Sequence, residues 1–217
     1  MATNILLTLI ITALNFLCIA FAFDPSPLQD FCVADLTSTA RVNGLACKDP
    51  STVKADDFFF RGLHLPGNTT NPLGAALTPV NVNRVPGLNT LGLTIARLDL
   101  AANGFIPPHT HPRATEILTV LQGSLEVGFV TTGPTYTQFS KVLEKGDVFV
   151  IPIGLLHYQR NVDNGNTVVL AAVNSQNAGI IAVTNGVFGV EPQINSDYLA
   201  RAFQLDKKTI QELQAKF

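Results

Sequence analysis

Three of the four histidines stand near one glutamate at spacings that can build a metal site. His109 and His111 are separated by a single residue, and Glu116 follows shortly after them. On a β-strand, side chains at i and i+2 point to the same face, so His109 and His111 can direct both imidazoles at one point. The fourth histidine, His64, stands alone in a loop-like segment, and we expect it to be unrelated to the site.

The position of Glu116 requires a break in the strand. It lies an odd number of residues after His111 and would face the other way on an unbroken strand. Pro112 cannot continue a sheet ladder, and it marks where a bulge or turn could reset the alternation. His157 would then have to arrive from a later strand that pairs nearby.

Three neutral imidazoles and one carboxylate form a mixed nitrogen and oxygen donor set. Such a set leaves a divalent cation with a formal charge of about +1 and suits manganese, iron, copper or zinc. The usual order of affinity among divalent metals for a given set of donors favours copper or zinc over manganese. The donors alone therefore do not identify the metal. The alternative from His-x-His alone is that these are unrelated surface or core residues.

The surrounding sequence predicts the strands that must position these residues. Short apolar and β-branched runs alternate with turns such as Gln122-Gly123, 132–134, 145–147 and 164–166. This spacing predicts an all-β antiparallel sandwich or barrel. The runs cover residues 91–100, 116–121, 125–131, 136–143, 147–151, 157–160, 167–174 and 180–183.

Both ends of the chain differ from this pattern. Past residue 195 the apolar period becomes helical, with Ser196 and Asp206 as expected caps of two short helices. Residues 5–22 are nearly all apolar and uncharged, and Ala20-Phe21-Ala22 resembles a signal-peptidase site, which predicts a signal peptide over 1–22 and a mature chain from near Phe23. A retained membrane anchor is the alternative.

Secretion agrees with the cysteine count, because removal of Cys18 leaves an even pair, Cys32 and Cys47. We expect them to form a disulfide, the alternative being two buried free thiols. Asn68 opens a glycosylation sequon in a Pro/Gly/Asn-rich loop. We therefore divide the chain into the signal peptide, an N-terminal extension over 23–90 with the disulfide and the glycosylation loop, a barrel core over 91–195, and C-terminal helices over 196–217.

Composition excludes several classes of protein. Charged residues make up 14% and hydrophobic residues 47% of the 217 residues, which rules out intrinsic disorder. The net charge of −2 provides no basic surface, so we expect no nucleic-acid partner. Three cysteines are too few for a zinc scaffold or an iron–sulfur protein.

Two motifs give the chain a family resemblance. Residues 104–116, Gly-Phe-Ile-Pro-Pro-His-Thr-His-Pro-Arg-Ala-Thr-Glu, resemble the first cupin motif, and residues 146–161 match the signature positions of the second. With the signal peptide, the cysteine pair and the sequon, the whole chain resembles plant germin-like proteins. The resemblance implies a jelly-roll-type cupin β-barrel and a homohexamer in the cell wall or apoplast. It also implies manganese bound by four residues, which are His109, His111, Glu116 and His157.

Two departures from the family pattern bear on function. Asn103 replaces the first glycine of a usual pair, and asparagine tolerates the left-handed backbone that such a turn needs. Oxalate-oxidising germins resemble this chain but carry two asparagines where it has Ala96 and Ile106. Neither side chain can donate a hydrogen bond. Losing two charge-assisted bonds of roughly 1.5 to 3 kcal/mol each makes oxalate a poor substrate.

The preferred function is therefore a secreted manganese protein that dismutates superoxide, a small anion, with no membrane association after signal cleavage. Arg97 and Arg113 could steer anions or serve structural pairing. The rival is a non-enzymatic wall, storage or ligand-binding oligomer, because cupins include members without catalysis. Hydrolysis of nucleotide sugars is a third possibility, but the sequence contains no phosphate-binding loop and no basic cluster to support it.

Overall fold

The computed structural model describes residues 28–40 and 44–217. The predicted signal peptide over 1–22 and the expected new N-terminus near Phe23 lie outside the described residues. The chain divides into two units, Met1–Phe31 and Cys32–Phe217. Only residues 28–31 of the first unit are described, so the fold that follows is that of the second.

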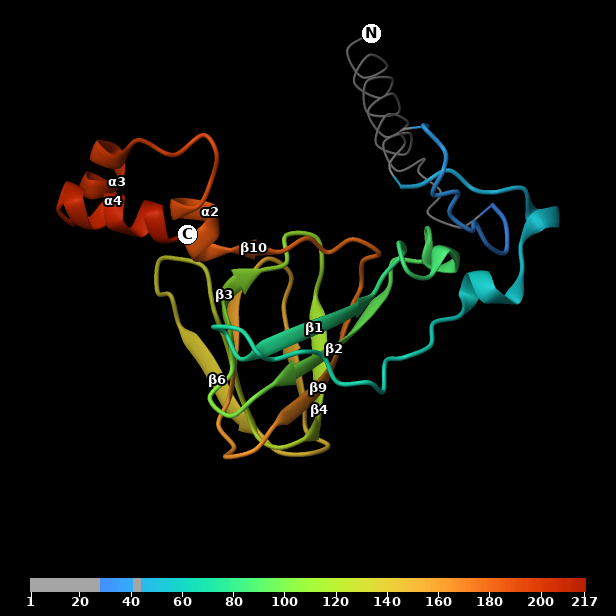
Figure 1. The fold of residues 1–217 in the computed structure, drawn as a ribbon, viewed down its shortest axis with the longest axis horizontal. Helices are drawn as coiled ribbons and strands as arrows, with labels where there is room; N and C mark the ends of the chain where they lie inside the picture. The colour runs from blue at the N-terminus through green and yellow to red at the C-terminus, as the bar shows by residue number, and fades with distance from the viewer. Residues whose placement is uncertain (1–27, 41–43) are drawn as a thin grey trace, which may run out of the picture. The chain divides into compact units, whose positions relative to one another are not determined.

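The described residues form two five-stranded antiparallel sheets (Figure 1). The first sheet has the order β1-β2-β9-β4-β7 and the second the order β10-β3-β8-β5-β6. The strands of the first sheet are β1 (Ala75–Val80), β2 (Thr94–Leu100), β9 (Thr167–Val173), β4 (Glu116–Gln122) and β7 (Val148–Ile151). Those of the second are β10 (Ile181–Ala182), β3 (Phe105–Thr110), β8 (Leu156–Asn161), β5 (Leu125–Val130) and β6 (Gln138–Leu143).

The core lies between the two sheets, because alternate side chains of each strand point inward. In β4 the inward positions Glu116, Leu118 and Val120 are buried, whereas Ile117 and Leu121 are exposed. The buried cluster takes side chains from both sheets and consists of Leu98, Leu100, Leu118, Val120, Leu125, Val127, Leu143, Ile151 and Val169. This arrangement confirms the predicted all-β, jelly-roll-type barrel.

Eight strands coincide with the runs read from the sequence, but β1 and β3 were not among those runs. Both contain proline, which removes a donor from the ladder and weakens the strand signal. Pro79 is tolerated because β1 is the edge of its sheet. In β3 the prolines lie where the pairing with β8 shifts by one residue, between Ile106 and His109.

The turn into β3 keeps its geometry despite the missing glycine. Asn103 has a φ of +62°, the left-handed value expected for this position. The next residue, Gly104, allows no side chain, because a Cβ there would overlap the carbonyl oxygen of Gly74. The segment 73–74 and the start of β3 are thereby held in contact, with Phe105 N donating to the Leu73 carbonyl at 2.9 Å.

The segment before the barrel contains the predicted disulfide. Cys32 and Cys47 are bonded, with their Cα atoms 4.9 Å apart, inside the usual range of about 4.4 to 6.8 Å. Two short 3₁₀ helices, η1 (Pro50–Thr52) and η2 (Ala55–Phe58), follow in this segment, and a third, η3 (Pro86–Leu88), lies between β1 and β2. Asn89, fully buried after η3, donates to the Leu45 carbonyl at 2.7 Å and ties this segment to the barrel.

Three short helices follow the barrel: α2 (Val183–Phe188), α3 (Ser196–Phe203) and α4 (Lys207–Lys216). Asp206 caps α4 as predicted, accepting from Thr209 N at 2.9 Å. The predicted cap Ser196 is wrong by one residue, because Asn195 accepts from Tyr198 N and Ser196 is the first helical residue. Helix α2 was not predicted, since only its first residue, Val183, falls in an expected strand run. None of the described helices is long and apolar enough to cross a membrane.

Candidate metal centre

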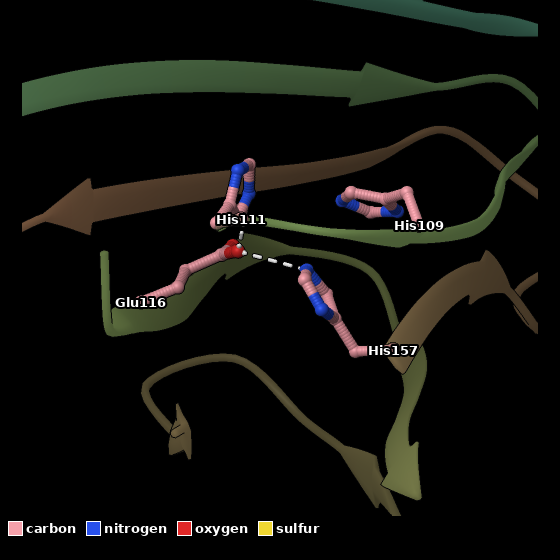
Figure 2. A group of neighbouring side chains, drawn as sticks. All are labelled: His109, His111, Glu116 and His157. Atoms are coloured by element: carbon pink, nitrogen blue, oxygen red, sulfur yellow. Dashed lines mark ion pairs between the residues drawn. The ribbon is translucent and has the colours of Figure 1, made fainter. Parts of the chain in front are cut away.

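The two sheets bring the four predicted ligands together at one end of the barrel interior (Figure 2). His109 lies in β3 directly opposite His157 in β8, and Glu116 begins β4 in the other sheet. One ligand atom from each of the four side chains lies within 4.8 Å of the others. The spread is slightly wider than the 3 to 4.5 Å expected for ligands around one ion.

The change of sheet explains how Glu116 comes to face the histidines. Pro112 and Arg113 form a turn after β3, and the chain then enters β4 of the facing sheet. The predicted turn at Pro112 is therefore present. An additional bulge lies earlier, since Ile106 pairs with Gln159 and His109 with His157. Three residues of β3 thus span two of β8, which places both Ile106 and His109 on the interior side.

Each imidazole is oriented by a backbone carbonyl. The Nδ1 atoms of His109, His111 and His157 lie 2.8, 2.7 and 2.8 Å from the carbonyl oxygens of Pro107, Gly179 and Leu155. A carbonyl only accepts hydrogen bonds, so Nδ1 carries the proton in each ring. The Nε2 lone pair then remains free to bind a metal, the arrangement found where an outer hydrogen bond fixes a ligating histidine.

The glutamate supplies the negative charge. Its Oε2 lies 3.1 Å from Nε2 of His111 and 3.3 Å from Nε2 of His157. Glu116 Oε2 and His157 Nε2 are both buried and have no hydrogen-bond partner among the described residues. Buried polar atoms without partners cost free energy, and a shared cation removes that cost for both atoms. The residues present therefore fit a divalent metal ion.

The pKa values describe the same site without a metal. Burial, and to a smaller extent the neighbouring His157, lower the pKa of His109 from 6.5 to about 4. Burial also acts against a charge on His111, but the contacts with Glu116 and the Gly179 carbonyl outweigh it and raise the His111 pKa. Burial raises the Glu116 pKa, yet His111 and His157 dominate and bring it down to about 2. Without metal, the pKa of His111 is therefore raised and that of Glu116 lowered, so each group favours the charged form of the other.

A cavity of about 380 Å³ opens beside the ligands. Ala96 of β2 and Ile106 of β3 are among its lining residues, together with His109, His111 and Glu116. Gln159 also lines the cavity and was not among the site residues predicted from the sequence. Gln159 is 3% exposed, and its Oε1 has no hydrogen-bond partner in the described structure. Its position two residues after His157, on the same strand face, was the available signal.

The remaining candidates lie away from the ligands or have structural roles. Arg97 pairs with Asp99 at 2.7 Å and approaches the carbonyl of His64, so it supports the loop before β1. Arg113 donates to the Asn177 carbonyl at 2.9 Å. Asn68 is exposed, and its side-chain oxygen accepts from Thr70 N at 2.9 Å.

Comparisons with known proteins agree with this geometry. Residues 61–211 match the cupin family. Putative germin-like protein 2-3 of Oryza sativa subsp. japonica is 60% identical over 196 residues, covering 90% of this chain and 88% of the rice protein. An oxalate oxidase solved with the substrate analogue glycolate has a TM-score of 0.85 at 42% identity, covering 90% of this chain and 98% of that one.

A further solved structure carries a different description. Peruvianin-I, described as a cysteine peptidase from Thevetia peruviana latex, has a TM-score of 0.70 at 40% identity, covering 74% of this chain and 98% of that one. In the part of this chain that the structure describes, both cysteines are joined in the disulfide. Those residues therefore provide no thiol nucleophile, whereas they do provide four metal ligands.

Proposed function

Because this chain belongs to the cupin family and, within it, to the germin-like proteins, we propose that it is a secreted manganese protein that dismutates superoxide. The observation that supports this most is the His₃Glu site, whose four ligand atoms converge beside a cavity. His109, His111, Glu116 and His157 would hold the ion. When bound, manganese would supply one-electron chemistry between its +2 and +3 states.

The reaction converts two superoxide ions and two protons into dioxygen and hydrogen peroxide. The protein's part is to attract and admit the anion. Three neutral imidazoles and one carboxylate leave a divalent ion with a formal charge of about +1, which favours entry of a small anion. Nδ1 of each histidine stays bound to its carbonyl, so the rings keep their orientation while substrate enters and product leaves.

Oxalate is the less favoured substrate. Ala96 and Ile106 line the cavity beside the ligands and offer no hydrogen-bond donor. A buried dianion needs such donors to replace the water it loses. The solved oxalate oxidase binds glycolate, but at 42% identity that activity does not transfer to a site with apolar side chains at these two positions.

The alternative is a non-enzymatic wall, storage or ligand-binding oligomer. The cavity favours it in one respect, since about 380 Å³ is roughly a dozen times the volume that one water occupies. Superoxide needs far less room. A structural metal would use the same four ligands, so their presence does not separate the two functions.

The same proposal includes the compartment and the assembly. Residues 1–22 would direct secretion into the apoplast, where a disulfide such as Cys32–Cys47 persists. Exposed Asn68 would carry a glycan. Association between copies of this chain is supported by exposed apolar side chains on the outer face of the first sheet, which include Ile117, Val148 and Val150. The number of six copies comes from the resemblance to germin-like proteins.

Elemental analysis combined with a superoxide assay tests this function. Glycoprotein purified from plant cells should contain about one manganese per chain and dismutate superoxide. His157→Ala should lose both, because it removes one of four ligands. Manganese-loaded protein without dismutase activity would contradict the enzymatic function and favour the ligand-binding oligomer.

A further inference from the structure

The turn that carries His111 is bonded to a distant loop at three successive carbonyl groups. Arg113 Nε donates to the carbonyl of Asn177 at 2.9 Å, and Arg113 N donates to that of Ala178 at 3.2 Å. Nδ1 of His111 donates to the next carbonyl, that of Gly179, at 2.7 Å. The segment 177–179 is therefore held against the turn, although Arg113 and Asn177 are 64 residues apart in the sequence.

His111 depends on this loop more than the other two ligand histidines do. His109 and His157 lie opposite each other in paired strands, and each ring is oriented by a carbonyl two residues before it. His111 lies just beyond the end of β3, and its side chain is 12% exposed compared with 1% for His157. The orientation of its ring therefore rests on the position of the Gly179 carbonyl.

The loop is anchored separately at its two ends. At its start, Asn174 Oδ1 accepts from Thr115 N at 2.7 Å. At its end, β10 pairs with β3. Within the part of the chain that the structure describes, the side chains that donate to the segment 177–179 between these anchors are those of His111 and Arg113.

The guanidinium group of Arg113 fits this segment closely. Nε and one terminal nitrogen donate to the carbonyl and to the side-chain oxygen of Asn177, at 2.9 and 3.2 Å. They are neighbouring donors of one planar group, an arrangement that a lysine ammonium cannot reproduce. Gly179 leaves room for the group, since a Cβ there would lie 2.9 Å from that terminal nitrogen and 3.2 Å from Cζ.

We propose that Arg113 is a positioning residue for the metal ligand His111, because it holds the loop whose Gly179 carbonyl orients the imidazole. This inference rests on the metal centre of the proposed function. The alternative role for an exposed arginine here is to steer anions toward the metal by its charge. Positioning needs both donors of the guanidinium group, whereas steering needs only the positive charge.

Arg113→Ala and Arg113→Lys separate these two roles. Manganese affinity of the intact protein, measured by competition with a chelator, should fall about tenfold in the alanine variant, as expected for a lost outer contact of a ligating histidine. The lysine variant keeps the charge but has one donor nitrogen, so its affinity should lie closer to the alanine variant than to wild type. Steering predicts wild-type manganese affinity in both variants, with a kcat/KM for superoxide that falls with alanine and is restored by lysine. That result would overturn positioning.

Arg160→Ala is the matched control. Arg160 is also exposed and follows the ligand His157 by three residues, but it pairs with Glu126 at 2.6 Å on another part of the surface. Its loss should leave manganese affinity at the wild-type value. An equal fall of affinity in Arg160→Ala and Arg113→Ala would overturn the specific role of Arg113.

Exchange of the histidine ring protons provides a measurement that needs neither metal nor activity. In metal-free protein, NMR can follow the Nδ1 protons of the three ligand histidines, whose exchange with solvent reports opening of each hydrogen bond. In Arg113→Ala the His111 proton should exchange about tenfold faster, in line with the loss of affinity. The protons of His109 and His157 should keep their rates, because their carbonyl partners lie elsewhere. Faster exchange of all three protons would indicate a general loss of stability and overturn the proposal.

A double variant shows whether Arg113 acts through the Gly179 carbonyl. Arg113→Ala with Gly179→Ala should lose about as much manganese affinity as the more damaging single change, because both disturb one contact. A loss equal to the product of the two single losses would mean independent effects and contradict the proposal.

Superoxide dismutation measured on the same preparations keeps the two proposals apart. Manganese binding without dismutation would remove the proposed activity and leave the role of Arg113 intact. Dismutation by wild-type protein, with unchanged manganese affinity and unchanged His111 proton exchange in Arg113→Ala, would overturn the positioning role alone.

Discussion

Nδ1 of His111 donates a hydrogen bond to the carbonyl of Gly179, 2.7 Å away and 68 residues further along the chain. Of the three ligand histidines, His111 alone is oriented from such a distance, since His109 and His157 use carbonyls two residues before them. The loop between β9 and β10 is therefore part of the metal site, although it provides no ligand.

Gly179→Ala should weaken metal binding. Gly179 has a φ of +69°, and a Cβ there would lie 2.9 Å from a terminal nitrogen of Arg113. Moving this carbonyl disturbs the orientation of His111, and loss of such outer contacts typically lowers metal affinity by about 10-fold to 100-fold. We expect about tenfold, measured by competition with a chelator. Gly146→Ala is the control, with a φ of +93° and open space around its Cβ. An equal loss of affinity in both variants would contradict the role of the Gly179 carbonyl.

In metal-free protein, His111 should titrate at a higher pH than His109. The His111 pKa is raised by Glu116 and the Gly179 carbonyl against the opposing effect of burial, whereas burial lowers that of His109 to about 4. Near pH 6, therefore, His111 carries a proton and His109 does not. NMR titration of the ring protons checks this order, with His109→Gln and His111→Gln providing the assignments.

The same order predicts how metal affinity depends on pH. A metal must displace the proton from His111, so affinity should fall as the pH drops below the raised His111 pKa. The two histidines affect the pH dependence of folding stability in opposite directions. His109, with its depressed pKa, contributes stability to the metal-free protein that is lost as the pH falls from 6.5 toward about 4. His111 contributes stability at low pH that is lost as the pH rises through its raised pKa.

Removing the disulfide should lower stability without affecting the metal site. Cys32→Ala with Cys47→Ala opens a loop with a sequence separation of 15 residues, for which loop-closure entropy gives about 3 kcal/mol. The ligands come from β3, the turn after it, β4 and β8, and none lies in this segment. Urea unfolding should show the loss, and chelator competition should show wild-type affinity. If the double variant folds but no longer binds metal, the disulfide and the metal site are not independent.

Mass spectrometry of protein secreted from plant cells tests the N-terminal predictions. The chain should begin near Phe23 and carry a glycan on Asn68. Asn68→Gln and Thr70→Ala should each remove the glycan, because both destroy the sequon, and the second leaves the asparagine in place. A chain that still begins at Met1 would contradict secretion through a cleaved signal.

The ligand residues could be predicted from the sequence because their chemistry is local in two short motifs, whereas their surroundings depend on pairing between distant strands. His109 and His157 become direct neighbours only through the register of β3 and β8. The one signal for Gln159, its position two residues after His157, pointed to the site only once β8 was placed against the cavity. Helix α2 was missed because its sequence, Val-Thr-Asn-Gly-Val-Phe, is rich in β-branched residues and contains glycine, which local propensity assigns elsewhere.

Introducing two amides should change the preference of the site toward oxalate. Ala96→Asn with Ile106→Asn places two donors on the cavity wall, and two charge-assisted bonds of roughly 1.5 to 3 kcal/mol each correspond to about two to four orders of magnitude in oxalate affinity. Manganese should stay bound, because neither residue is one of the four ligands.

The oxalate experiment needs a measurement of folding stability and a matched control variant. Burying two amides without a ligand costs roughly 1 to 3 kcal/mol each, so the unfolding free energy must be measured beside oxalate binding. Ile95→Asn with Phe105→Asn introduces the same two amides at neighbouring positions that do not line the cavity, and it should gain no oxalate affinity. If unmodified protein oxidises oxalate readily, the apolar side chains at Ala96 and Ile106 do not govern substrate choice, because the site then accepts a dianion without the amides.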